Sequence, residues 1–384
     1  MTGTMRWVTA HAAAQYEAVT LFAPKPTGKV VRFDITMPFH ARRVRLVLCE
    51  RYGEEPVIYD RALLCMRDKA WSVTFNGDAE AVLLPAQELK SDAVPAEASK
   101  GDMFTLWLFH AGKHSPRSFT VVPARYCKPE ALCGKEPPFN DDQFKILSML
   151  HGACCYARLE AETDDESACA VVAFGDSITA MGMWTEPFYK KLSEQNGPVL
   201  LNMGINGNRL LLDTSMPLLK KTQFFGRAGL TRFPWDVAAL PGVRAVIIAL
   251  GVNDISQPRD KKHRSPHCSE RCTAEALIAG FEKLIALCKE KNLKTMGCTI
   301  TPFGGYLTHN DVTERIRGEV NDWILNGGAF DMTADFASAV CDPERPEHLF
   351  HAYDSGDHLH PSALGGEQMA ESIDLLSLMN LTRI

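Results

Sequence analysis

Three residues of this chain, from two distant segments, have the side chains of a nucleophilic catalytic triad. Ser177 lies in the segment Gly-Asp-Ser-Ile-Thr (175–179), whereas Asp357 and His360 lie within one turn of each other near the end of the 384 residues. A serine hydroxyl is a weak nucleophile until a base removes its proton. An imidazole does this well when a carboxylate orients its ring and stabilises the imidazolium that forms. We therefore expect Ser177 as nucleophile, His360 as base and Asp357 as the partner of the base.

Each of these residues also has a simpler interpretation. The pattern Asp-Ser-x-Thr suits a helix start, so Ser177 alone is equally well explained as an N-cap. Asp357 and His360 alone are better explained as a surface pair that precedes a helix. His358 competes with His360 for the role of base, although its spacing to Asp354 is less suitable. The catalytic interpretation therefore depends on further groups elsewhere in the chain.

Acyl transfer also requires donors for the oxyanion of its tetrahedral intermediate, each worth about 3 kcal/mol. Gly207 ends a Gly-x-x-Gly loop, where the missing side chain lets a backbone N–H approach a substrate. Asn253, in the segment Gly-Val-Asn-Asp (251–254), offers a side-chain amide, and the N–H of Ser177 is a third donor. Glycines and Asn-Asp pairs are usually turn residues, so each donor is a weak signal alone. Together they are informative, because three successive expected strands each end in one required group.

The chain after residue 168 alternates between apolar strands and helices. The expected strands cover 170–174, 199–203, 245–250, 294–300 and 330–336. The expected helices cover about 184–195, 273–291, 311–324 and a last segment after Pro361-Ser362. Continuous apolar strands alternating with helices predict an α/β fold, a parallel sheet with helices on both faces. In such sheets ligands bind at the carboxyl ends of the strands, where the candidate residues lie.

The first 150 residues have a different pattern, in which short β-like runs are separated by Gly, Pro and Asn/Asp turn signals. These runs are 30–35, 44–48, 71–75, 104–108 and 119–122. Short strands at this spacing predict an antiparallel β-sandwich, of jelly-roll-like type. We expect this domain to cover residues 1–150, followed by an irregular linker at 151–167 and a catalytic domain at 168–384.

Composition limits the partners and the location of the protein. The chain is 46% hydrophobic with a net charge of -6, and it has no basic stripe, so we expect no nucleic-acid partner. No apolar run approaches the roughly 18 residues that span a membrane. Twelve cysteines without a signal peptide predict free thiols in a reducing compartment, the cytoplasm. The oligomeric state stays open.

Three further residues near the expected strand ends are candidates for substrate contact. They are Asp176, Trp184 and Arg209. Arg209 is at least as well explained by an ordinary salt bridge. Aromatic side chains such as that of Trp184 more often pack in a core than bind a substrate.

A group of metal-binding residue types follows Asn253 in the sequence. The group consists of His263, His267, Cys268 and Cys272. Cys-x-x-x-Cys in one loop, without a second cysteine pair at zinc-finger spacing, is a weak metal signal. We therefore expect neither a metal nor an organic cofactor.

The four segments resemble the sequence blocks of the SGNH hydrolase superfamily, also called the GDSL family of lipases and esterases. Gly175-Asp176-Ser177-Ile178 is similar to the first block, with Ile in place of Leu. Gly207 matches the glycine of the second block, Asn253 the asparagine of the third, and Asp357 and His360 the last pair. Thr179 replaces the last glycine of Gly-x-Ser-x-Gly, which argues against an α/β-hydrolase.

The resemblance covers about residues 168–380 and is closest to a bacterial subgroup with an N-terminal β-domain. It implies a flavodoxin-like three-layer α/β/α sandwich, the triad Ser177, His360 and Asp357, and oxyanion donors from Ser177, Gly207 and Asn253. It also implies a serine esterase, with a small acyl group such as acetyl on a carbohydrate as the first choice of substrate. A lysophospholipid or a thioester is an alternative within the family. An alternative of another class is a carbohydrate-binding protein that acts through its β-domain.

Overall fold

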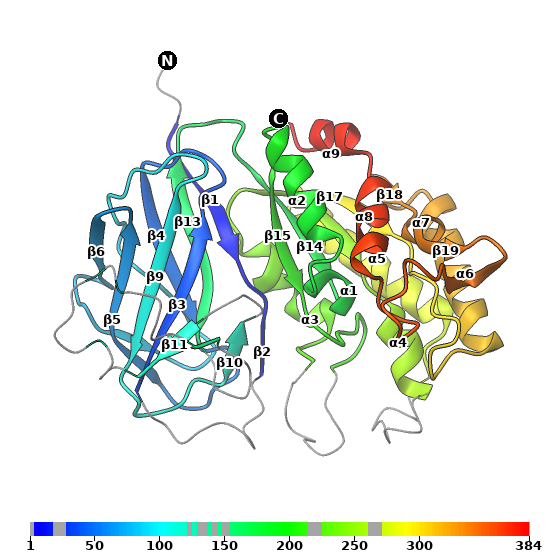
Figure 1. Ribbon diagram of the computed structural model, residues 1–384, viewed down its shortest axis with the longest axis horizontal. Helices are drawn as coiled ribbons and strands as arrows, with labels where there is room; N and C mark the ends of the chain where they lie inside the picture. The colour runs from blue at the N-terminus through cyan, green and yellow to red at the C-terminus, as the bar shows by residue number, and fades with distance from the viewer. Residues whose placement is uncertain are drawn as a thin grey trace. The chain divides into compact units, whose positions relative to one another are not determined.

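The computed structural model describes most of the chain and divides into two compact units, Met1–Ala168 and Cys169–Ile384 (Figure 1). The described residues are 4–17, 28–120, 125–128, 132, 137, 139, 145–146, 154–213, 225–259 and 271–383.

The first unit is built from antiparallel strands, as the sequence predicts. Its strands are β1 (Arg6–Ala12), β2 (Gln15–Glu17), β3 (Lys29–Thr36), β4 (Arg43–Cys49), β5 (Val57–Met66), β6 (Lys69–Val73), β7 (Ala81–Leu83), β8 (Glu88–Lys90), β9 (Met103–His110), β10 (Ser118–Thr120), β11 (Arg125–Cys127), β12 (Lys145–Ile146) and β13 (Tyr156–Thr163). One sheet has the order β1-β13-β4-β8, and another has β12-β11-β3-β9-β5-β6 with β7 beside β5. The ring of Phe33 from β3 stacks on Tyr156 from β13, with 5.0 Å between centroids. The two sheets therefore pack face to face, as in a sandwich.

The expected linker at 151–167 needs correction. Residues 156–163 form β13, which pairs antiparallel with β1 on one side and with β4 on the other. A strand paired on both edges lies inside its sheet and belongs to the β-domain. The division between the units falls after Ala168, close to the expected start of the second domain.

The second unit is a doubly wound α/β sandwich around a parallel sheet. Its strands are β14 (Ala170–Gly175), β15 (Val199–Gly204), β16 (Val243–Ala249), β17 (Lys294–Cys298) and β18 (Met332–Ala334), with a short antiparallel pair β19 (Cys341–Asp342) and β20 (Arg345–Leu349). The sheet order β15-β14-β16-β17-β18 is the flavodoxin-like order 2-1-3-4-5. β14 is buried throughout, because it lies between β15 and β16 under helices on both faces.

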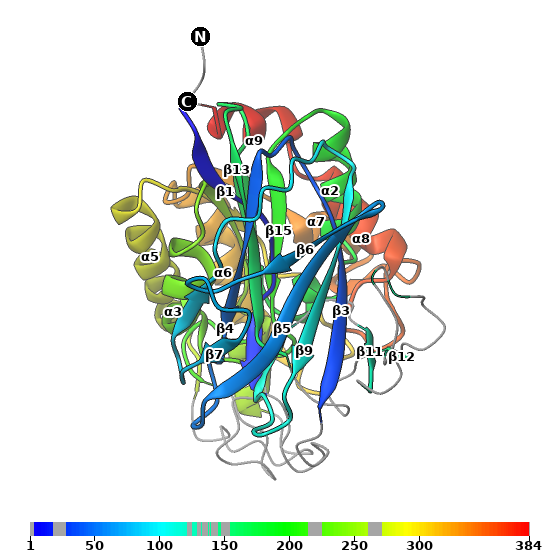
Figure 2. The ribbon, with the colours of Figure 1, turned by 90° about the vertical axis from the view of Figure 1, so that its left-hand side faces the viewer.

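The helices cover both faces of this sheet. They are α1 (Ser177–Ala180), α2 (Thr185–Glu194), α3 (Gly229–Phe233), α4 (Val252–Ser256), α5 (Ala274–Glu290), α6 (Asp311–Asn326), α7 (Phe336–Val340), α8 (Ala363–Glu371) and α9 (Leu375–Leu381). A π-helical turn, Pro234–Ala238, continues α3, and a 3-10 turn, Gln257–Arg259, continues α4. Figure 2 shows α2 and α8 on one side of the sheet and α5 and α6 on the other.

Local signals begin α5 and α8, and end α5, where the sequence predicts. The Thr273 side chain accepts a hydrogen bond from the Ala276 N–H and caps α5. Asn292, just after this helix, has φ +53°, a left-handed conformation that asparagine tolerates better than most residues. Ser362 caps α8 in the same way as Thr273, through the N–H of Gly365. These caps satisfy orphan N–H groups at the helix ends.

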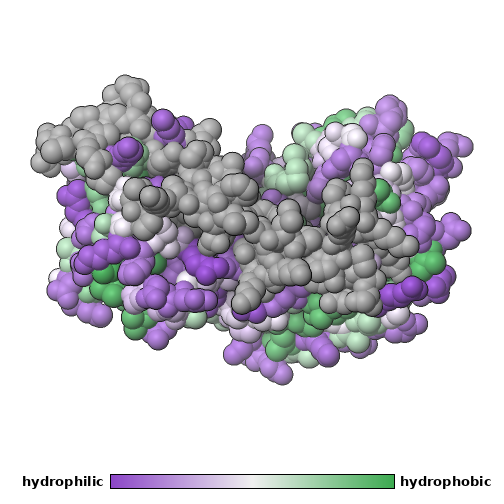
Figure 3. Space-filling view, turned by 90° about the horizontal axis from the view of Figure 1, so that it is seen from below, coloured by the Kyte–Doolittle hydropathy of each residue, from purple (hydrophilic) through white to green (hydrophobic). Residues whose placement is uncertain are grey.

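The coloured surface in Figure 3 is largely hydrophilic, and its hydrophobic residues are interspersed with polar ones. In the part of the chain that the structure describes, no helix has the length and apolar character needed to cross a bilayer.

Candidate active site

Ser177 lies at the turn between β14 and α1, at the carboxyl edge of the parallel sheet. Asp176, and not Ser177, is the N-cap of α1, because its side chain accepts the Ile178 N–H at 3.0 Å. The turn is tight at Gly175, where an added Cβ would lie 2.9 Å from the Ala249 carbonyl oxygen and closer still to Thr179. The alternative explanation of Ser177 as an N-cap is therefore wrong, and its hydroxyl is available for chemistry.

A continuous hydrogen-bond relay joins the three residues expected to form the triad. Ser177 Oγ lies 2.8 Å from His360 Nε2, and His360 Nδ1 lies 2.6 Å from Asp357 Oδ2. With its proton on Nδ1, the imidazole donates to the carboxylate and presents the lone pair of Nε2 to the serine hydroxyl. The structure thus brings together residues 183 positions apart in the arrangement that general-base catalysis requires.

The loop that carries Asp357 holds this carboxylate in one orientation. Asp357 Oδ1 accepts hydrogen bonds from the N–H groups of His360 at 2.8 Å and Leu359 at 3.0 Å, and from Ser355 Oγ at 3.1 Å. Partial burial raises the pKa of Asp357, but the hydrogen bonds from His360 and from the backbone outweigh this and lower it to about 2. The carboxylate therefore stays ionised at neutral pH and can stabilise an imidazolium on His360.

The competing histidine has a carboxylate partner of its own but does not meet the serine. His358 Nδ1 lies 2.6 Å from Asp354 Oδ2, and the His358 N–H donates to Asp354 Oδ1 at 3.0 Å. This pair copies the geometry of Asp357 and His360 in the same loop. The ring nitrogen that contacts Ser177 belongs to His360, so the choice of His360 over His358 agrees with the geometry.

Asn253 follows β16 and Gly207 follows β15, the two strands that flank β14, and both contact the side chain of Gln257. Asn253 is 6% exposed, and its Nδ2 is buried without a hydrogen-bond partner among the described residues. A buried donor without a partner is destabilising unless it serves a ligand. Gly207 has φ +71°, and a Cβ there would collide with the Phe225 ring, so this position requires glycine. Both groups suit the oxyanion role.

Two residues that sequence reasoning missed support this edge of the sheet. The side-chain Nε2 of Gln257 donates to the Gly207 carbonyl oxygen at 2.7 Å and to Asn253 Oδ1 at 3.2 Å. Arg232 is fully buried and donates to the carbonyl oxygens of Gly175 at 2.9 Å and Met203 at 2.8 Å, at the ends of β14 and β15. Gln257 stands four residues after Asn253, one helical turn on, which is the one sequence signal that could have revealed it.

The three residues expected as possible substrate contacts are all buried. Trp184 is 0% exposed and packs against Phe336 with ring centroids 5.2 Å apart, so it is a core residue and the expectation of substrate contact is corrected. Arg209 is 2% exposed, with its Nε 4.0 Å from Asp254 Oδ1, and is likewise internal. Asp176 is 2% exposed and caps α1, and burial raises its pKa to about 7.

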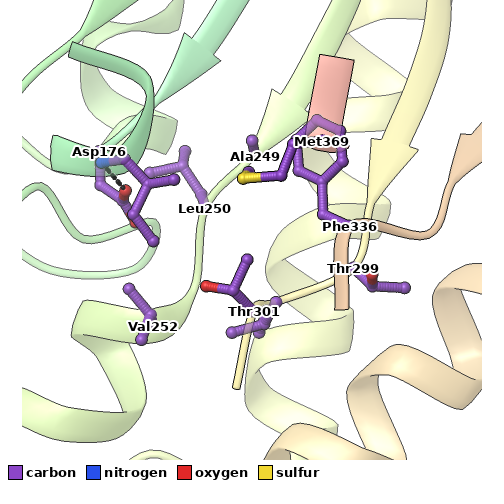
Figure 4. A pocket seen from close by; sticks show the side chains of 10 residues that line it. Asp176, Ala249, Leu250, Val252, Thr299, Thr301, Phe336 and Met369 are labelled. Atoms are coloured by element: carbon purple, nitrogen blue, oxygen red, sulfur yellow. Dashed lines mark hydrogen bonds between the residues drawn. The ribbon is translucent and has the colours of Figure 1, made fainter. Parts of the chain in front are cut away.

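A small apolar cavity lies beside the nucleophile turn, at the carboxyl ends of β14, β16 and β17. Its lining residues are Asp176, Ile178, Ala249, Leu250, Val252, Thr299, Ile300, Thr301, Phe336 and Met369 (Figure 4). The cavity volume is about 20 Å³, which is room for about one water molecule or methyl group. Asp176 and Ile178 precede and follow Ser177 in the chain, whereas Ser177 itself is not among the residues that line the cavity.

The residues weighed as zinc ligands lie largely outside the described residues. His263, His267 and Cys268 are among those not described, and Cys272 is buried with its Sγ 3.5 Å from the Thr273 carbonyl oxygen. Among the residues that the structure does describe, no group of three or more His, Cys, Asp or Glu side chains could hold a metal ion.

A flavodoxin-like sheet with a serine relay at its carboxyl edge defines a serine hydrolase of the three-layer α/β/α type. Residues 171–373 match the family model of the GDSL-like lipases and acylhydrolases. The chain therefore belongs to this family and is a carboxylic ester hydrolase. No curated protein matches the sequence.

Solved structures align with about half of the chain. A GDSL-like lipase from Bacteroides thetaiotaomicron VPI-5482 is 19% identical with a TM-score of 0.39, over 56% of this chain and 90% of its own. A putative acylhydrolase from Bacteroides fragilis NCTC 9343 is 22% identical with a TM-score of 0.40, over 57% and 90%. Est24, a carbohydrate acetylesterase from Sinorhizobium meliloti, is 16% identical with a TM-score of 0.38, over 53% and 94%.

Proposed function

We propose that this protein hydrolyses esters of short acyl groups through an acyl-enzyme on Ser177, with His360 as general base and Asp357 as its partner. The observation that carries the proposal is the relay from Asp357 through His360 to Ser177, with contacts of 2.6 Å and 2.8 Å. Nucleophile, base and orienting carboxylate are then within hydrogen-bond reach before any substrate binds.

In the first half-reaction, Ser177 Oγ attacks the ester carbonyl carbon while its proton moves to His360 Nε2. The carbonyl oxygen becomes an oxyanion, which the N–H of Ser177, the N–H of Gly207 and Asn253 Nδ2 stabilise. The intermediate collapses when the C–O bond to the alcohol breaks and His360 returns the proton to the leaving oxygen. The products are the free alcohol and an acyl-Ser177 ester.

In the second half-reaction, water replaces the alcohol. His360 Nε2 takes a proton from the water as its oxygen attacks the acyl carbon, and the same donors stabilise the second oxyanion. The bond to Ser177 Oγ then breaks, and His360 returns the proton to the serine. The carboxylic acid leaves and the enzyme is regenerated.

The small cavity supports a short acyl group. It is lined mainly by apolar side chains, including Leu250, Ile300 and Met369, and it holds about one methyl-sized group. An acetyl group presents one methyl beyond the reacting carbon, which matches a space of this size, whereas an octanoyl chain is too long to be held within it. A carbohydrate or related small molecule as the alcohol is our proposal from the family resemblance.

We also propose a cytoplasmic location. The ten cysteines that the structure describes carry free thiols, and nine of them are buried. Unpaired cysteines in this number suit a reducing compartment.

The test is the chain-length profile of hydrolysis. We expect the wild type to hydrolyse p-nitrophenyl acetate with a higher kcat/KM than the butyrate and a far higher one than the octanoate, and to release acetate from acetylated sugars. Ser177→Ala should remove turnover of every ester while keeping the far-UV circular dichroism and the Tm of the wild type. A preference for octanoate would refute the short-acyl proposal, and turnover by a folded Ser177→Ala protein would refute the mechanism.

A further inference from the structure

We propose that Gln257 is a positioning residue of the oxyanion site. Its side chain orients the Asn253 amide so that the NH2 group points toward the substrate. The inference rests on the proposed acyl-enzyme mechanism and assigns a role to a side chain outside the triad and the three oxyanion donors. Gln257 lies at the end of α4, half-buried, one helical turn after Asn253.

The orientation of the Gln257 amide follows from its contact with the backbone. The end of the Gln257 side chain lies 2.7 Å from the carbonyl oxygen of Gly207, which can only accept a hydrogen bond. The end of the Gln257 side chain that faces it must therefore be the NH2 group. Oε1 is then directed elsewhere and is buried without a partner among the described residues.

The orientation of Asn253 follows in turn from that of Gln257. The same Nε2 lies 3.2 Å from the Asn253 amide and has its second hydrogen to donate. Only an oxygen can accept that hydrogen, so Asn253 presents Oδ1 to Gln257. Its Nδ2 is left on the other side, buried and without a partner in the described part of the chain.

This chain of contacts solves a specific problem of a side-chain oxyanion donor. An amide is nearly symmetric in shape, so packing alone holds its two orientations almost equally well. In one orientation Asn253 donates to the oxyanion, whereas in the other its oxygen repels the same charge. Gln257 removes this ambiguity, and its contact with Gly207 ties a second oxyanion donor to the same amide.

Two substitutions of similar size separate this role from simple packing. Gln257→Met keeps most of the side-chain volume but loses the donor, so Asn253 should populate both orientations and kcat should fall about 3- to 10-fold. Gln257→Glu places an acceptor against Asn253, which should turn its NH2 toward the glutamate and its oxygen toward the substrate. We expect kcat to fall about 100-fold or more, as though the donor were lost. KM should change little in both variants, because the interaction forms in the transition state.

The decisive measurement repeats both substitutions in an Asn253→Ala background, with p-nitrophenyl acetate as substrate and the Tm of each variant as a check on folding. If Gln257 acts through Asn253, neither substitution should lower kcat more than about 3-fold further, because the group that it orients is absent. If Gln257→Met and Gln257→Glu lower kcat equally, and by the same factor again in the Asn253→Ala background, the inference is overturned and Gln257 has only a structural role. If the Glu variant does not fold, the cycle with Gln257→Met decides alone.

Failure of this inference differs from failure of the mechanism itself. Full activity of a folded Ser177→Ala or Asn253→Ala protein would reject the proposed acyl-enzyme chemistry. If both of those variants lose activity but the effects of Gln257→Met and Asn253→Ala on kcat are additive, only the role of Gln257 is rejected.

Discussion

The substitution Asp357→Asn should move the proton of the His360 imidazole from Nδ1 to Nε2 without moving the ring. Oδ1 of Asp357 accepts two backbone N–H groups, from His360 and Leu359. In the variant these donors require an oxygen at that position, so the new NH2 group must occupy the position of Oδ2, 2.6 Å from His360 Nδ1. An NH2 group there can only donate, so Nδ1 must accept and the proton of the ring must move to Nε2.

This tautomer cannot act as a base toward Ser177, because Nε2 now carries the hydrogen that faces the serine oxygen. The same change of carboxylate to amide in a Ser-His-Asp triad lowers kcat by about 10⁴. At about 1.36 kcal/mol for each factor of ten, this corresponds to about 5 kcal/mol of transition-state stabilisation. KM should change little, since Asp357 lies behind the imidazole and the lost interaction belongs to the transition state.

The loop contains a matched control for this experiment. Asp354 binds His358 through the same pair of contacts, 2.6 Å to Nδ1 and 3.0 Å from the backbone N–H. Asp354→Asn should leave kcat within about 3-fold of the wild type, measured with p-nitrophenyl acetate at neutral pH, because His358 does not contact the serine. Equal losses in both variants, or a loss below 10-fold in a folded Asp357→Asn protein, would refute the assignment of His360 as base.

Three other substitutions test further parts of the account. Asn253→Ala should lower kcat about 10²- to 10³-fold with little change in KM, in steady-state assays, because it removes one buried oxyanion donor. Burial raises the pKa of Asp176 from 3.8 to about 7, so its contribution to stability is present below pH 4 and is lost as the pH rises toward 7. Asp176→Asn keeps the capping oxygen but cannot ionise, so the free energy of unfolding should no longer fall by about 1.4 kcal/mol per pH unit in this range. Urea unfolding between pH 4 and 8 measures this, and a pH dependence equal to that of the wild type would contradict the burial argument. Met369→Ala should enlarge the cavity and raise the ratio of kcat/KM for the butyrate to kcat/KM for the acetate. It should also destabilise the protein by about 2–5 kcal/mol. An unchanged ratio would show that the cavity does not bind the acyl group.

The catalytic groups could be predicted from the sequence because short-range chemistry marks them. Ser177, Gly207 and Asn253 each stand just after a strand that is visible as a continuous apolar run. In a parallel sheet the carboxyl ends of such strands meet at one edge, so adjacency along the chain translates into adjacency in space. The pairing of Asp357 with His360 follows from their separation of three residues.

The supporting residues could not be predicted in the same way. Arg232 binds carbonyl oxygens at the ends of two different strands, and neither partner is indicated by a local pattern around it. Trp184 was expected as a possible substrate contact, but its packing against Phe336, more than 150 positions later, makes it a core residue. Such contacts depend on how distant elements pack, which one sequence does not reveal.

Among the strands of the β-domain that the sequence analysis does not predict, three share a physical reason. β1, β5 and β13 each contain a register shift, at Thr9/His11, Tyr59/Arg61 and Tyr156/Arg158. A bulge inserts one residue and interrupts the two-residue alternation by which a half-buried strand is recognised. β3 and β4, which contain no such shift, fall where the sequence predicts them.

The central claim is that Ser177 carries the acyl group during turnover. The most direct test is intact-protein mass spectrometry of the wild type, Asp357→Asn and Ser177→Ala, each quenched in acid during hydrolysis of p-nitrophenyl acetate, followed by peptide mapping. The account predicts an added acetyl group on the peptide that contains Ser177 in the acylating wild type, its absence in Ser177→Ala, and its slow accumulation in Asp357→Asn. An acetyl group on any other residue, or steady turnover by the Ser177→Ala protein, would contradict it.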